Sequence, residues 1–460
     1  MIIDYNIRIE DLHEDLKRFW NLSGDKILSI DKSFDPSKGA PVFTANGEYT
    51  TRGWTEWTHG FMYGSAILQY DATGEEQFLN IGREGTLKNM ASHISHIGVH
   101  DHGFNNISTY GNLLRLIKEG KIEGNEWEAN FYKQAIMISG AVQASRWQEI
   151  IEGGYIYSFN GPHSLFVDTI RSVRILVLSH LLGHKLHAEN DKIINLLERG
   201  IQHTMATAKY SVFYGEGRDR YDVPGRTAHE SIFNINDGNY RCPGTQQGYS
   251  GFTTWTRGLA WAICGFTEEL ELIDALSDKE LEIAGGRHEI EEFMVKAAIA
   301  TSDYYISETP TDGIPYWDTG APGLGHIGEF RDSPSDPFNG FEPVDSSAAS
   351  IACQGLLRLG RHFEELGNFE ESRKYTQAGL TVIKTLLSDK YLSLDPAHQG
   401  LILHSIYHYP NDWDYIPEGS KIPYGESSMW GDYHAREFAI YLQKIINKEP
   451  YYTFFNSVIY

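Results

Sequence analysis

The chain has 460 residues, 41% of them hydrophobic, which is enough to bury a large core, and 62 acidic against 39 basic residues give a net charge of -23. This charge disfavours an electrostatic nucleic-acid binder, because such a protein needs a basic face. It does not exclude an anionic small molecule, since a few buried arginines and histidines can hold one carboxylate locally.

The cysteines and the first residues bear on the compartment. Cys242, Cys264 and Cys353 are widely spaced, which indicates neither a disulfide framework nor a zinc knuckle. The first residues lack the basic start and long apolar run of a secretory signal, and no transmembrane stretch is present in the sequence. We therefore predict a cytoplasmic protein without membrane contact. A chain trimmed of its signal peptide and located in the periplasm would have the same sequence.

Helical periodicity dominates the chain. Apolar residues recur with i, i+3, i+4 spacing at 61–70, 107–117 and 348–359. Strand-like alternation is scarce and short, as at 155–157 and 401–404. The sequence therefore predicts an all-α fold with little sheet.

The turns between helices share one style. Near Gly74, Gly183 and Gly367 an apolar helix ends and a polar residue opens the next helix. About a dozen helices of ~11–20 residues then fit an (α/α)6 barrel, a toroid of six helical hairpins. Because no linker-like tract divides the chain, we predict one domain over 1–460. The Gly- and Pro-rich runs are expected to form long loops over one mouth of the ring; they are 215–225, 309–343 and 409–425.

Aromatic rings and carboxylates gather among glycines in six separated patches. Flat rings suit the C–H faces of a pyranose, and Asp, His, Gln and Arg bind sugar hydroxyls or a carboxylate. The combination predicts carbohydrate chemistry. The patches are 53–61, 100–104, 167–169, 247–261, 315–318 and 430–433.

Two aspartates are candidates for proton chemistry. Asp168 follows the apolar run 164–167, and partial desolvation there would raise its pKa and suit it to donate a proton. The competing interpretation is a helix N-cap. Asp101 lies between His100 and His102. This spacing is found in metal-ligand pairs, and the competing interpretation is a solvated loop. No further ligand cluster accompanies it in the sequence, so we predict no metal and no other cofactor.

The remaining candidates are less specific. Arg257 and Trp261 are four residues apart and would lie on one helix face, either to bind a uronate or as a structural cation–π pair. His229 either orients water and substrate or caps a loop. Trp57 and Trp147 are stacking platforms or core residues. The Trp-Asp pairs that contain Asp318 and Asp432 are interpreted as structural.

In order and spacing, these patches resemble the unsaturated glucuronyl hydrolases of glycoside hydrolase family 88 over roughly 54–442. The matching motifs are Trp-Thr-His-Gly-Phe at 57–61, His-Asp-His-Gly-Phe at 100–104, Asp-Thr at 168–169, Gln-Gly-Tyr at 247–249, Trp-Thr-Arg-Gly-Leu-Ala-Trp at 255–261, Pro-Tyr-Trp-Asp at 315–318, Asp-Ser-Ser-Ala at 345–348 and Trp-Gly-Asp-Tyr at 430–433.

The resemblance implies an (α/α)6 barrel that removes a 4,5-unsaturated uronic acid from the non-reducing end of oligosaccharides left by polysaccharide lyases. It implies that Asp168 is the general acid and base, that Asp101 is an essential partner binding sugar hydroxyls, and that His229 orients water and substrate. The other residues implied to line the site are Gln247, Arg257, Trp261, Trp57, Trp147 and His100. In this chemistry C4 of the vinyl ether is protonated, water adds at C5, and the hemiketal opens, so no carboxylate pair flanks the anomeric carbon.

The chain departs from the family pattern after Asp168. Arg171 and Arg174 stand in a helix that is ordinarily apolar near its start. Our hypothesis is that Arg171 faces the pocket and favours an extra anionic group on the substrate. Trp147 is aligned across an insertion.

Three alternatives stay open. Unsaturated rhamnogalacturonyl hydrolases share the barrel and the chemistry but act on pectin fragments. Acylglucosamine epimerases use a similar toroid with paired catalytic histidines, and His229 has no evident partner in the sequence. A non-catalytic oligosaccharide-binding protein would need neither Asp168 nor Asp101. The sequence also leaves open the linkage, the second sugar, its sulfation and the oligomeric state.

Overall fold

The computed structural model describes residues 1–52 and 56–459, most of which are helical. Gly53, Trp54 and Thr55, which belong to the first aromatic patch, and Tyr460 lie outside the described residues.

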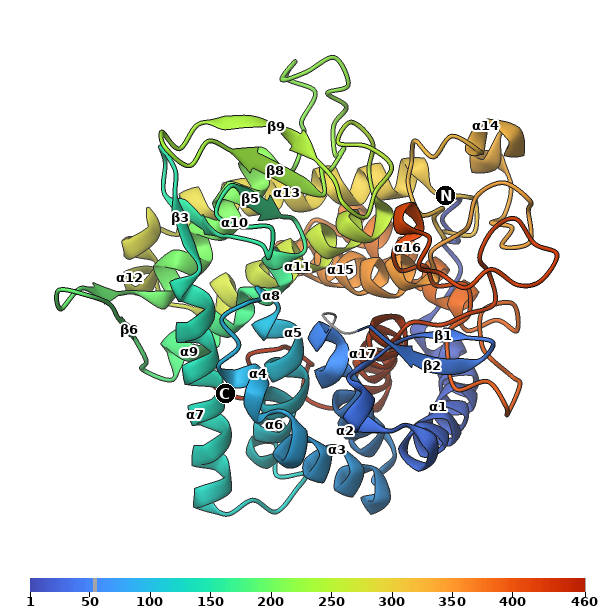
Figure 1. Cartoon of the computed structure of the whole chain (residues 1–460), viewed down its shortest axis with the longest axis horizontal. Coiled ribbons are helices and arrows are strands. Elements are labelled where there is room, and N and C mark those ends of the chain that lie inside the picture. Colours follow the sequence, from blue (N-terminus) through green and yellow to red (C-terminus); the bar gives the residue numbers. More distant parts are fainter. Residues whose placement is uncertain (53–55, 460) are drawn as a thin grey trace.

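Six helical units form an inner ring (Figure 1). Each unit contacts the next, and α17 packs against α2, which closes the ring. The (α/α)6 toroid predicted from the sequence is therefore confirmed. The units are α2 His59–Thr73; α5 His102–Asn106, which continues through a π-helical turn Ile107–Gly111 into α6 Asn112–Lys118; α8 Thr169–Ser172 with α9 Arg174–Leu181; α11 Thr256–Ala275; α15 Ser346–Glu365; and α17 Met429–Asn447.

An outer layer of helices covers the ring. Helices α1 and α3 pack on α2, α7 and α10 on α9, α13 on α11, and α16 on α15. Their bounds are α1 His13–Ser33, α3 Glu76–Asn89, α7 Glu126–Ser145, α10 Leu196–Tyr210, α13 Arg287–Glu308 and α16 Phe369–Leu386. The short helices are α4 Ala91–Ile94, α12 Asp278–Leu281 and α14 Leu324–Ile327. The three periodic segments predicted from the sequence lie in α2, in the π-turn with α6, and in α15.

Two of the three predicted turns join helices directly. Gly74 and Gly367 take the left-handed conformation, with φ of 72° and 74°, between α2 and α3 and between α15 and α16. Gly183 is also left-handed, at 86°, but the next element is a β-hairpin, so the predicted helix pair is wrong there. The reason is the tight turn at Asn190 and Asp191, both with φ of 58°, which suits a hairpin.

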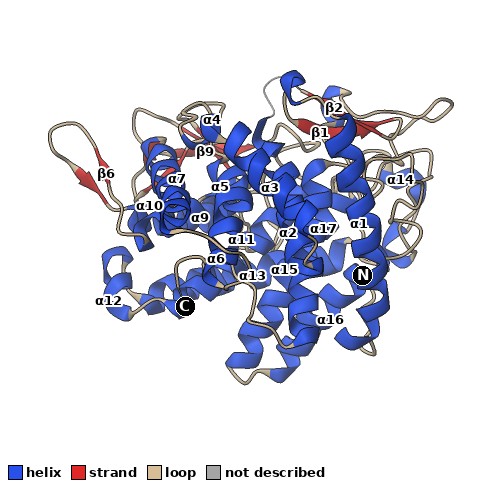
Figure 2. Cartoon of the chain, turned by 90° about the horizontal axis from the view of Figure 1, so that it is seen from below, coloured by secondary structure: helices blue, strands red, loops and turns tan. Residues whose placement is uncertain are grey.

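The strands are short, as the sequence predicts, and Figure 2 shows those it labels toward one end of the helical body. The antiparallel sheets are β1 Pro41–Ala45 with β2 Glu48–Thr51; β3 Trp147–Glu149 with β4 Gly154–Ile156; β6 Leu186–His187 with β7 Ile193–Ile194; and a three-stranded sheet of order β5-β8-β9, with β5 Ser164–Phe166, β8 Glu230–Phe233 and β9 Tyr240–Gly244.

The strand suggested at 401–404 is replaced by a single bridge between Leu392 and Ile402. Its N–H groups at Leu401 and Ile402 donate instead to the Asp432 carboxylate, both at 2.9 Å, so a side chain takes the place of a partner strand. In the described part of the chain, none of the helices is both long and apolar enough to cross a bilayer.

Candidate active site

All six inner helices begin at the same end of the ring, where a cavity of about 590 Å³ opens. Asp101 and Asp168 are the N-cap residues of α5 and α8, and Arg257 lies in the first turn of α11. Trp57 precedes α2 and stacks on Trp430 of α17, with ring centroids 5.1 Å apart. The sixth helix, α15, begins after its N-cap Asp345, which binds Arg257 (3.1 Å). The site is thus built from helix N-termini.

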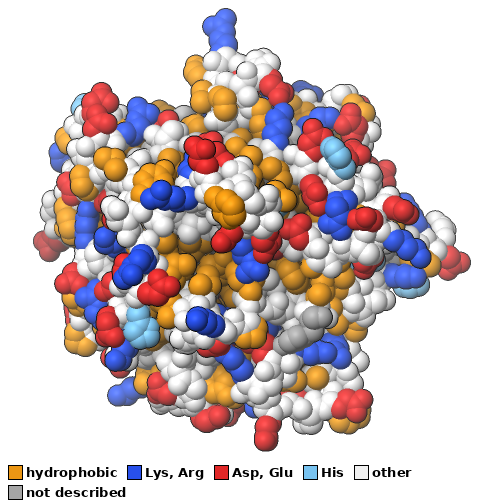
Figure 3. All heavy atoms as spheres, turned by 180° about the vertical axis from the view of Figure 1, so that it is seen from behind, with side chains coloured by type: hydrophobic (Ala, Val, Ile, Leu, Met, Phe, Trp, Pro, Cys, Tyr) orange, Lys and Arg blue, Asp and Glu red, His pale blue; other side chains and the backbone are white. Residues whose placement is uncertain are grey.

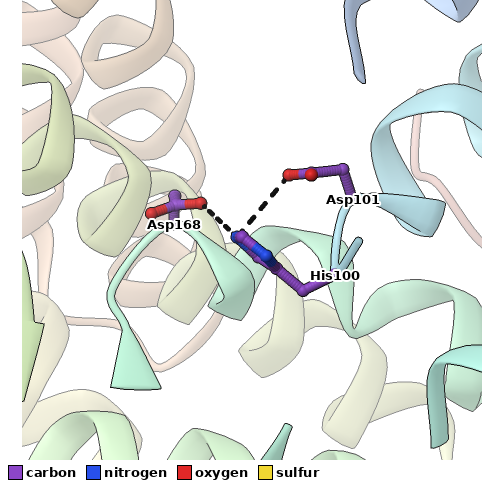
Figure 4. A group of neighbouring side chains, drawn as sticks. All are labelled: His100, Asp101 and Asp168. Carbon is purple, nitrogen blue, oxygen red and sulfur yellow. Dashed lines mark hydrogen bonds and ion pairs between the residues drawn. The ribbon is translucent and has the colours of Figure 1, made fainter. Parts of the chain in front are cut away.

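His100 lies between two carboxylates (Figure 4). Its Nε2 donates to Asp168 Oδ2 at 3.1 Å and lies 3.6 Å from Asp101 Oδ1. All three side chains are almost fully buried, yet all three line the cavity. The structure therefore brings together Asp101 and Asp168, which the resemblance implied to be catalytic, and His100, which it implied to line the site.

A glycine allows the two carboxylates to approach. A Cβ atom at Gly103 would lie 2.0 Å from the carbonyl oxygen of Ser172, so only glycine permits α5 to pack this closely on α8. The Ser172 hydroxyl accepts from the Gly103 N–H at 3.0 Å and donates to the His100 carbonyl at 2.6 Å. Gln143 donates to the same carbonyl at 2.7 Å. These contacts fix His100 between α5 and α8.

A short β-ladder brings His229 to Asp168. Strand β5 pairs with β8, and the N–H of Val167 donates to the His229 carbonyl at 2.9 Å, which continues the ladder by one residue. The Gln246 N–H donates to His229 Nδ1 at 3.0 Å, so in the neutral ring the proton is on Nε2. This Nε2 lies 3.7 Å from Asp168 Oδ1, and neither atom has a hydrogen-bond partner among the described residues.

His100 and His229 therefore flank one carboxylate. No histidine partner for His229 is evident from the sequence, because His100 and His229 are far apart in the chain. The fold supplies the second imidazole.

Charge in this cluster is unevenly distributed. Burial raises the pKa of Asp168. The hydrogen bond from His100 and the proximity of His229 together outweigh burial, so the pKa of Asp168 is held well below its usual range. Burial lowers the pKa of His100, yet the charges of Asp101 and Asp168 raise it overall. Burial and repulsion from Asp168 raise the pKa of Asp101. The raised pKa predicted for Asp168 is therefore wrong for the protein without substrate, because the sequence did not show the flanking imidazoles.

The competing N-cap interpretation of Asp168 is half correct. Asp168 occupies the N-cap position of α8, but its side chain makes no capping hydrogen bond. The same holds for Asp101 at the start of α5. Neither side chain caps its helix, and both carboxylates lie beside His100 instead.

Arg257 lies at the cavity wall, but its guanidinium already makes hydrogen bonds to other groups of the protein. It donates to Gln247 Oε1 at 2.7 Å, to Asp345 Oδ2 at 3.1 Å, and to the carbonyls of Ile406 and Tyr407. It stacks on Trp255 and Trp430, at 4.5 and 4.8 Å from the ring centroids, rather than on Trp261 as the four-residue spacing predicted. Arg257 thus orders the pocket and positions Gln247.

Arg171 does not face the pocket. Its buried guanidinium pairs with Glu268 at 3.0 Å and Glu437 at 2.8 Å, and lies 5.9 Å from the Trp261 ring centroid. The hypothesis that it recognises an anionic group on the substrate is wrong. Arg171 of α8 and Arg174 of α9 belong to a buried ionic layer with glutamates of α11 and α17, which are distant from these arginines in the sequence.

Trp57 and Trp261 line the cavity, whereas Trp147 lies outside its lining. Trp147 is on β3, where its ring packs against the Arg199 guanidinium at 4.6 Å. Asp318 and Asp432 also lie outside the lining and accept backbone hydrogen bonds, which agrees with their structural interpretation.

Curated relatives support the resemblance read from the sequence. An unsaturated glucuronyl hydrolase of Formosa agariphila is 25% identical over 395 residues, which cover 85% of this chain and 81% of that protein. An unsaturated glucuronyl hydrolase of Bacillus sp. strain GL1 is 25% identical over 417 residues, covering 88% and 90%. The chain is a homologue of the unsaturated glucuronyl hydrolases.

Solved structures agree in fold. The crystal structure of the enzyme from Bacillus sp. GL1 superposes with a TM-score of 0.66 at 20% identity, covering 93% of this chain and 95% of that one. An unsaturated glucuronyl hydrolase described as specific for heparin gives a TM-score of 0.69 at 18% identity, covering 95% and 98%. No protein-family model matches the sequence.

Sequence reasoning missed several cavity residues, among them Tyr407 and His408. The Asp414 carboxylate accepts their backbone N–H groups at 2.5 and 2.9 Å and so holds this loop at the cavity. Burial lowers the pKa of His408 to about 4, which keeps the ring neutral at pH 7. An aromatic-histidine run directly before the Gly- and Pro-rich segment 409–425 was the available signal.

The cluster also has the composition of a metal site. One ligand atom from each of His100, Asp101 and Asp168 lies within 4.8 Å of the others. The sequence could not show this, because Asp168 is 67 residues beyond Asp101. The arrangement equally suits an imidazolium that lies between two carboxylates, and the absence of a metal requirement stays a prediction.

Proposed function

We propose that this chain is an unsaturated uronyl hydrolase, which releases a 4,5-unsaturated uronic acid from the non-reducing end of lyase-generated oligosaccharides. The observation that carries the proposal is the buried Asp101–His100–Asp168 cluster inside an aromatic-walled cavity. The relatives' names support it, and one solved relative is described as responsible for the degradation of glycosaminoglycan.

The cluster can supply the proton that the vinyl ether needs. The carboxylates of Asp101 and Asp168 raise the pKa of His100, and the hydrogen bond from His100 lowers the pKa of Asp168, so we infer that the proton lies on His100 before substrate binds. A bound uronate adds a negative charge and excludes water, and both changes raise the pKa of a neighbouring carboxyl group. We infer that Asp168 then takes the proton from His100 and delivers it to C4.

Water must next add to C5. Asp168 returns to its ionised form after donating and can accept a proton from this water. The Nε2–H of His229, unpartnered and 3.7 Å from Asp168 Oδ1, is suited to orient the water beside that oxygen. The resulting hemiketal opens and releases the second sugar.

The cavity is suited to bind an anion, although the guanidinium of Arg257 is already hydrogen-bonded to groups of the protein. Inner helices begin there, and the N-terminus of a long helix such as α2 or α11 carries a partial positive charge of roughly half an elementary charge. Gln247, held by Arg257, and the neutral His408 add hydrogen-bonding groups. These groups support binding of the uronate carboxylate without a free Lys or Arg.

No other class of partner is proposed. On the face shown in Figure 3, Lys and Arg side chains are interspersed with Asp and Glu rather than gathered in a basic patch, which does not favour nucleic acid. A cytoplasmic location remains our prediction, and it is consistent with three free thiols at Cys242, Cys264 and Cys353.

The test is incubation with a panel of unsaturated disaccharides produced by glycosaminoglycan and pectin lyases. We expect loss of the absorbance of the conjugated double bond with at least one glycosaminoglycan-derived member. Turnover restricted to pectin-derived members would favour the rhamnogalacturonyl alternative. Binding without turnover across the panel would favour a carbohydrate-binding protein.

A further inference from the structure

The cavity lining contains a half-buried acidic residue, Glu56, whereas its arginine is bound by other groups of the protein. Among the described lining residues, the carboxylates are those of Glu56, Asp101 and Asp168, and the positive groups are the Arg257 guanidinium and the His100 ring that we infer to be protonated. Gly53, Trp54 and Thr55, next to Glu56 in the chain, carry no charge by their sequence. A group that enters the cavity therefore meets more negative than positive side chains.

The nearby arginines are engaged elsewhere. Arg257 is bound to Gln247, to Asp345 and to two carbonyls, as described above. Arg146, behind His100, donates to the carbonyls of Ile97, Tyr157 and Ser158. Arg52 is not in the lining; it donates to the Trp413 carbonyl and lies over the Phe43 and Trp413 rings.

The positive helix ends serve the inner part of the cavity only, because the effect of a helix dipole falls off within about a turn. Glu56 is half-buried and stands one residue before Trp57, and its own carbonyl accepts from Asn105 at 3.2 Å, which fixes its backbone beside α5. Phe159 is 40% exposed, and its ring packs against Phe166 with centroids 5.4 Å apart. An exposed ring suits the apolar face of a second sugar, whereas Glu56 repels an anionic substituent on it.

We propose, building on the proposed hydrolase activity, that the chain selects substrates whose second sugar is uncharged and discriminates against a sulfated second sugar, and that Glu56 is a determinant of this selection. The unsaturated uronate enters the inner cavity near the helix N-termini. The second sugar occupies the entrance between Glu56 and Phe159.

The experiment compares two unsaturated disaccharides that differ only in one sulfate on the second sugar. We expect kcat/KM to be at least about tenfold higher for the unsulfated member at low salt, because like charges are placed in proximity. Raising the ionic strength should narrow the difference, since salt screens exposed charges. Glu56→Gln should also narrow it, chiefly by raising kcat/KM for the sulfated member.

The matched control is Glu189→Gln, which makes the same charge change on the β6–β7 hairpin at the edge of the molecule (Figure 1) and should leave the ratio unaltered. Equal or faster turnover of the sulfated member would overturn the inference and would direct attention to Arg52. A difference that persists through both salt and Glu56→Gln would overturn the assignment to Glu56. Inactivity on both members would instead overturn the hydrolase proposal itself, and this inference with it.

Discussion

The chemistry at the residue scale depends on one proton shared by Asp168 and His100. Their 3.1 Å contact, with Asp101 at 3.6 Å on the other side of the imidazole, allows a buried cluster to hold a proton without a net excess of positive charge. A carboxyl group with an adjacent imidazolium can act as acid and then as base in one turnover.

Asp168→Asn should therefore abolish turnover while preserving the fold. The amide is nearly isosteric but cannot donate and retrieve a proton, and general acid–base help is worth ~10²–10⁴-fold. The measurement is kcat on the best unsaturated disaccharide, with circular dichroism as the folding check. Near-normal activity in a folded variant would remove Asp168 from its proposed role.

His100→Asn tests where the proton resides. The flanking carboxylates hold the pKa of His100 above its ordinary value, so the imidazolium persists below that raised pKa and is lost as pH rises through it. Wild-type kcat/KM should fall along the same alkaline limb. The variant should lose about ten- to a hundredfold in kcat, the effect of one charge-assisted hydrogen bond, and lack this limb.

The control is His288→Asn, at an exposed histidine on α13, which should keep the wild-type pH profile. An alkaline limb that persists in His100→Asn would assign it to another group.

Sequence reasoning predicted individual residues where chemistry and motif coincide. Asp101, Asp168, His100, Gln247, Arg257, Trp57 and Trp261 line one cavity, and His229 contacts it from behind Asp168. Sequence reasoning failed where the position or the pKa of a side chain depends on residues that are distant in the sequence. Arg171 could not be placed without Glu268 and Glu437, and the pKa of Asp168 could not be given the right direction without both imidazoles.

At the scale of elements, the inner helices carry both the site and a buried ionic layer beneath it. Helix α11 supplies Arg257 to the cavity and, further along, Glu268 and Glu269 to the interior. Glu268 pairs with Arg171 and Arg174, whereas Glu269 Oε1 has no partner among the described residues. Burial raises the pKa of Glu269 to about 8.

Glu269→Gln should stabilise the protein more as pH rises. In the wild type, Glu269 is protonated in the folded state below about 8, but it ionises in the unfolded chain above about 4.3. Folding must therefore take up a proton, at a cost that grows between these values. The melting temperatures of the two proteins should be similar near pH 4 and diverge in favour of the glutamine variant toward pH 8. A constant difference across this range would show that Glu269 is ionised in the fold.

Helices were predicted from periodicity because their apolar faces are local in sequence, as in α2 and α15. The β5-β8-β9 sheet was not predicted. Strands β5 and β8 pair across more than sixty residues, and the three strands are only three to five residues long, so no local pattern signals the ladder that brings His229 to Asp168.

At the scale of the whole molecule, the first and last inner helices close the ring. Helix α17 contacts both α15 and α2, so the C-terminal part of the chain completes a wall that begins near residue 59. Trp57 stacked on Trp430 places this closure at the cavity itself. We propose on this basis that residues 1–460 form one domain.

The chain should then unfold in one cooperative transition. Because each inner unit packs on two neighbours, local opening of one hairpin exposes the faces of the next. Calorimetry should show a single peak, and fluorescence and far-ultraviolet circular dichroism should give coincident midpoints. Two separated transitions would indicate independent units.

The most direct test of the central claim is to follow the reaction by NMR in deuterated, oxygen-18-labelled water, sampled early, before exchange beside the new carbonyl group. Protonation at C4 followed by hydration at C5 predicts a product with one solvent deuterium at C4, water oxygen at C5 and no remaining C4–C5 double bond. Release of the second sugar with the double bond intact, and water oxygen at the anomeric carbon, would contradict the account.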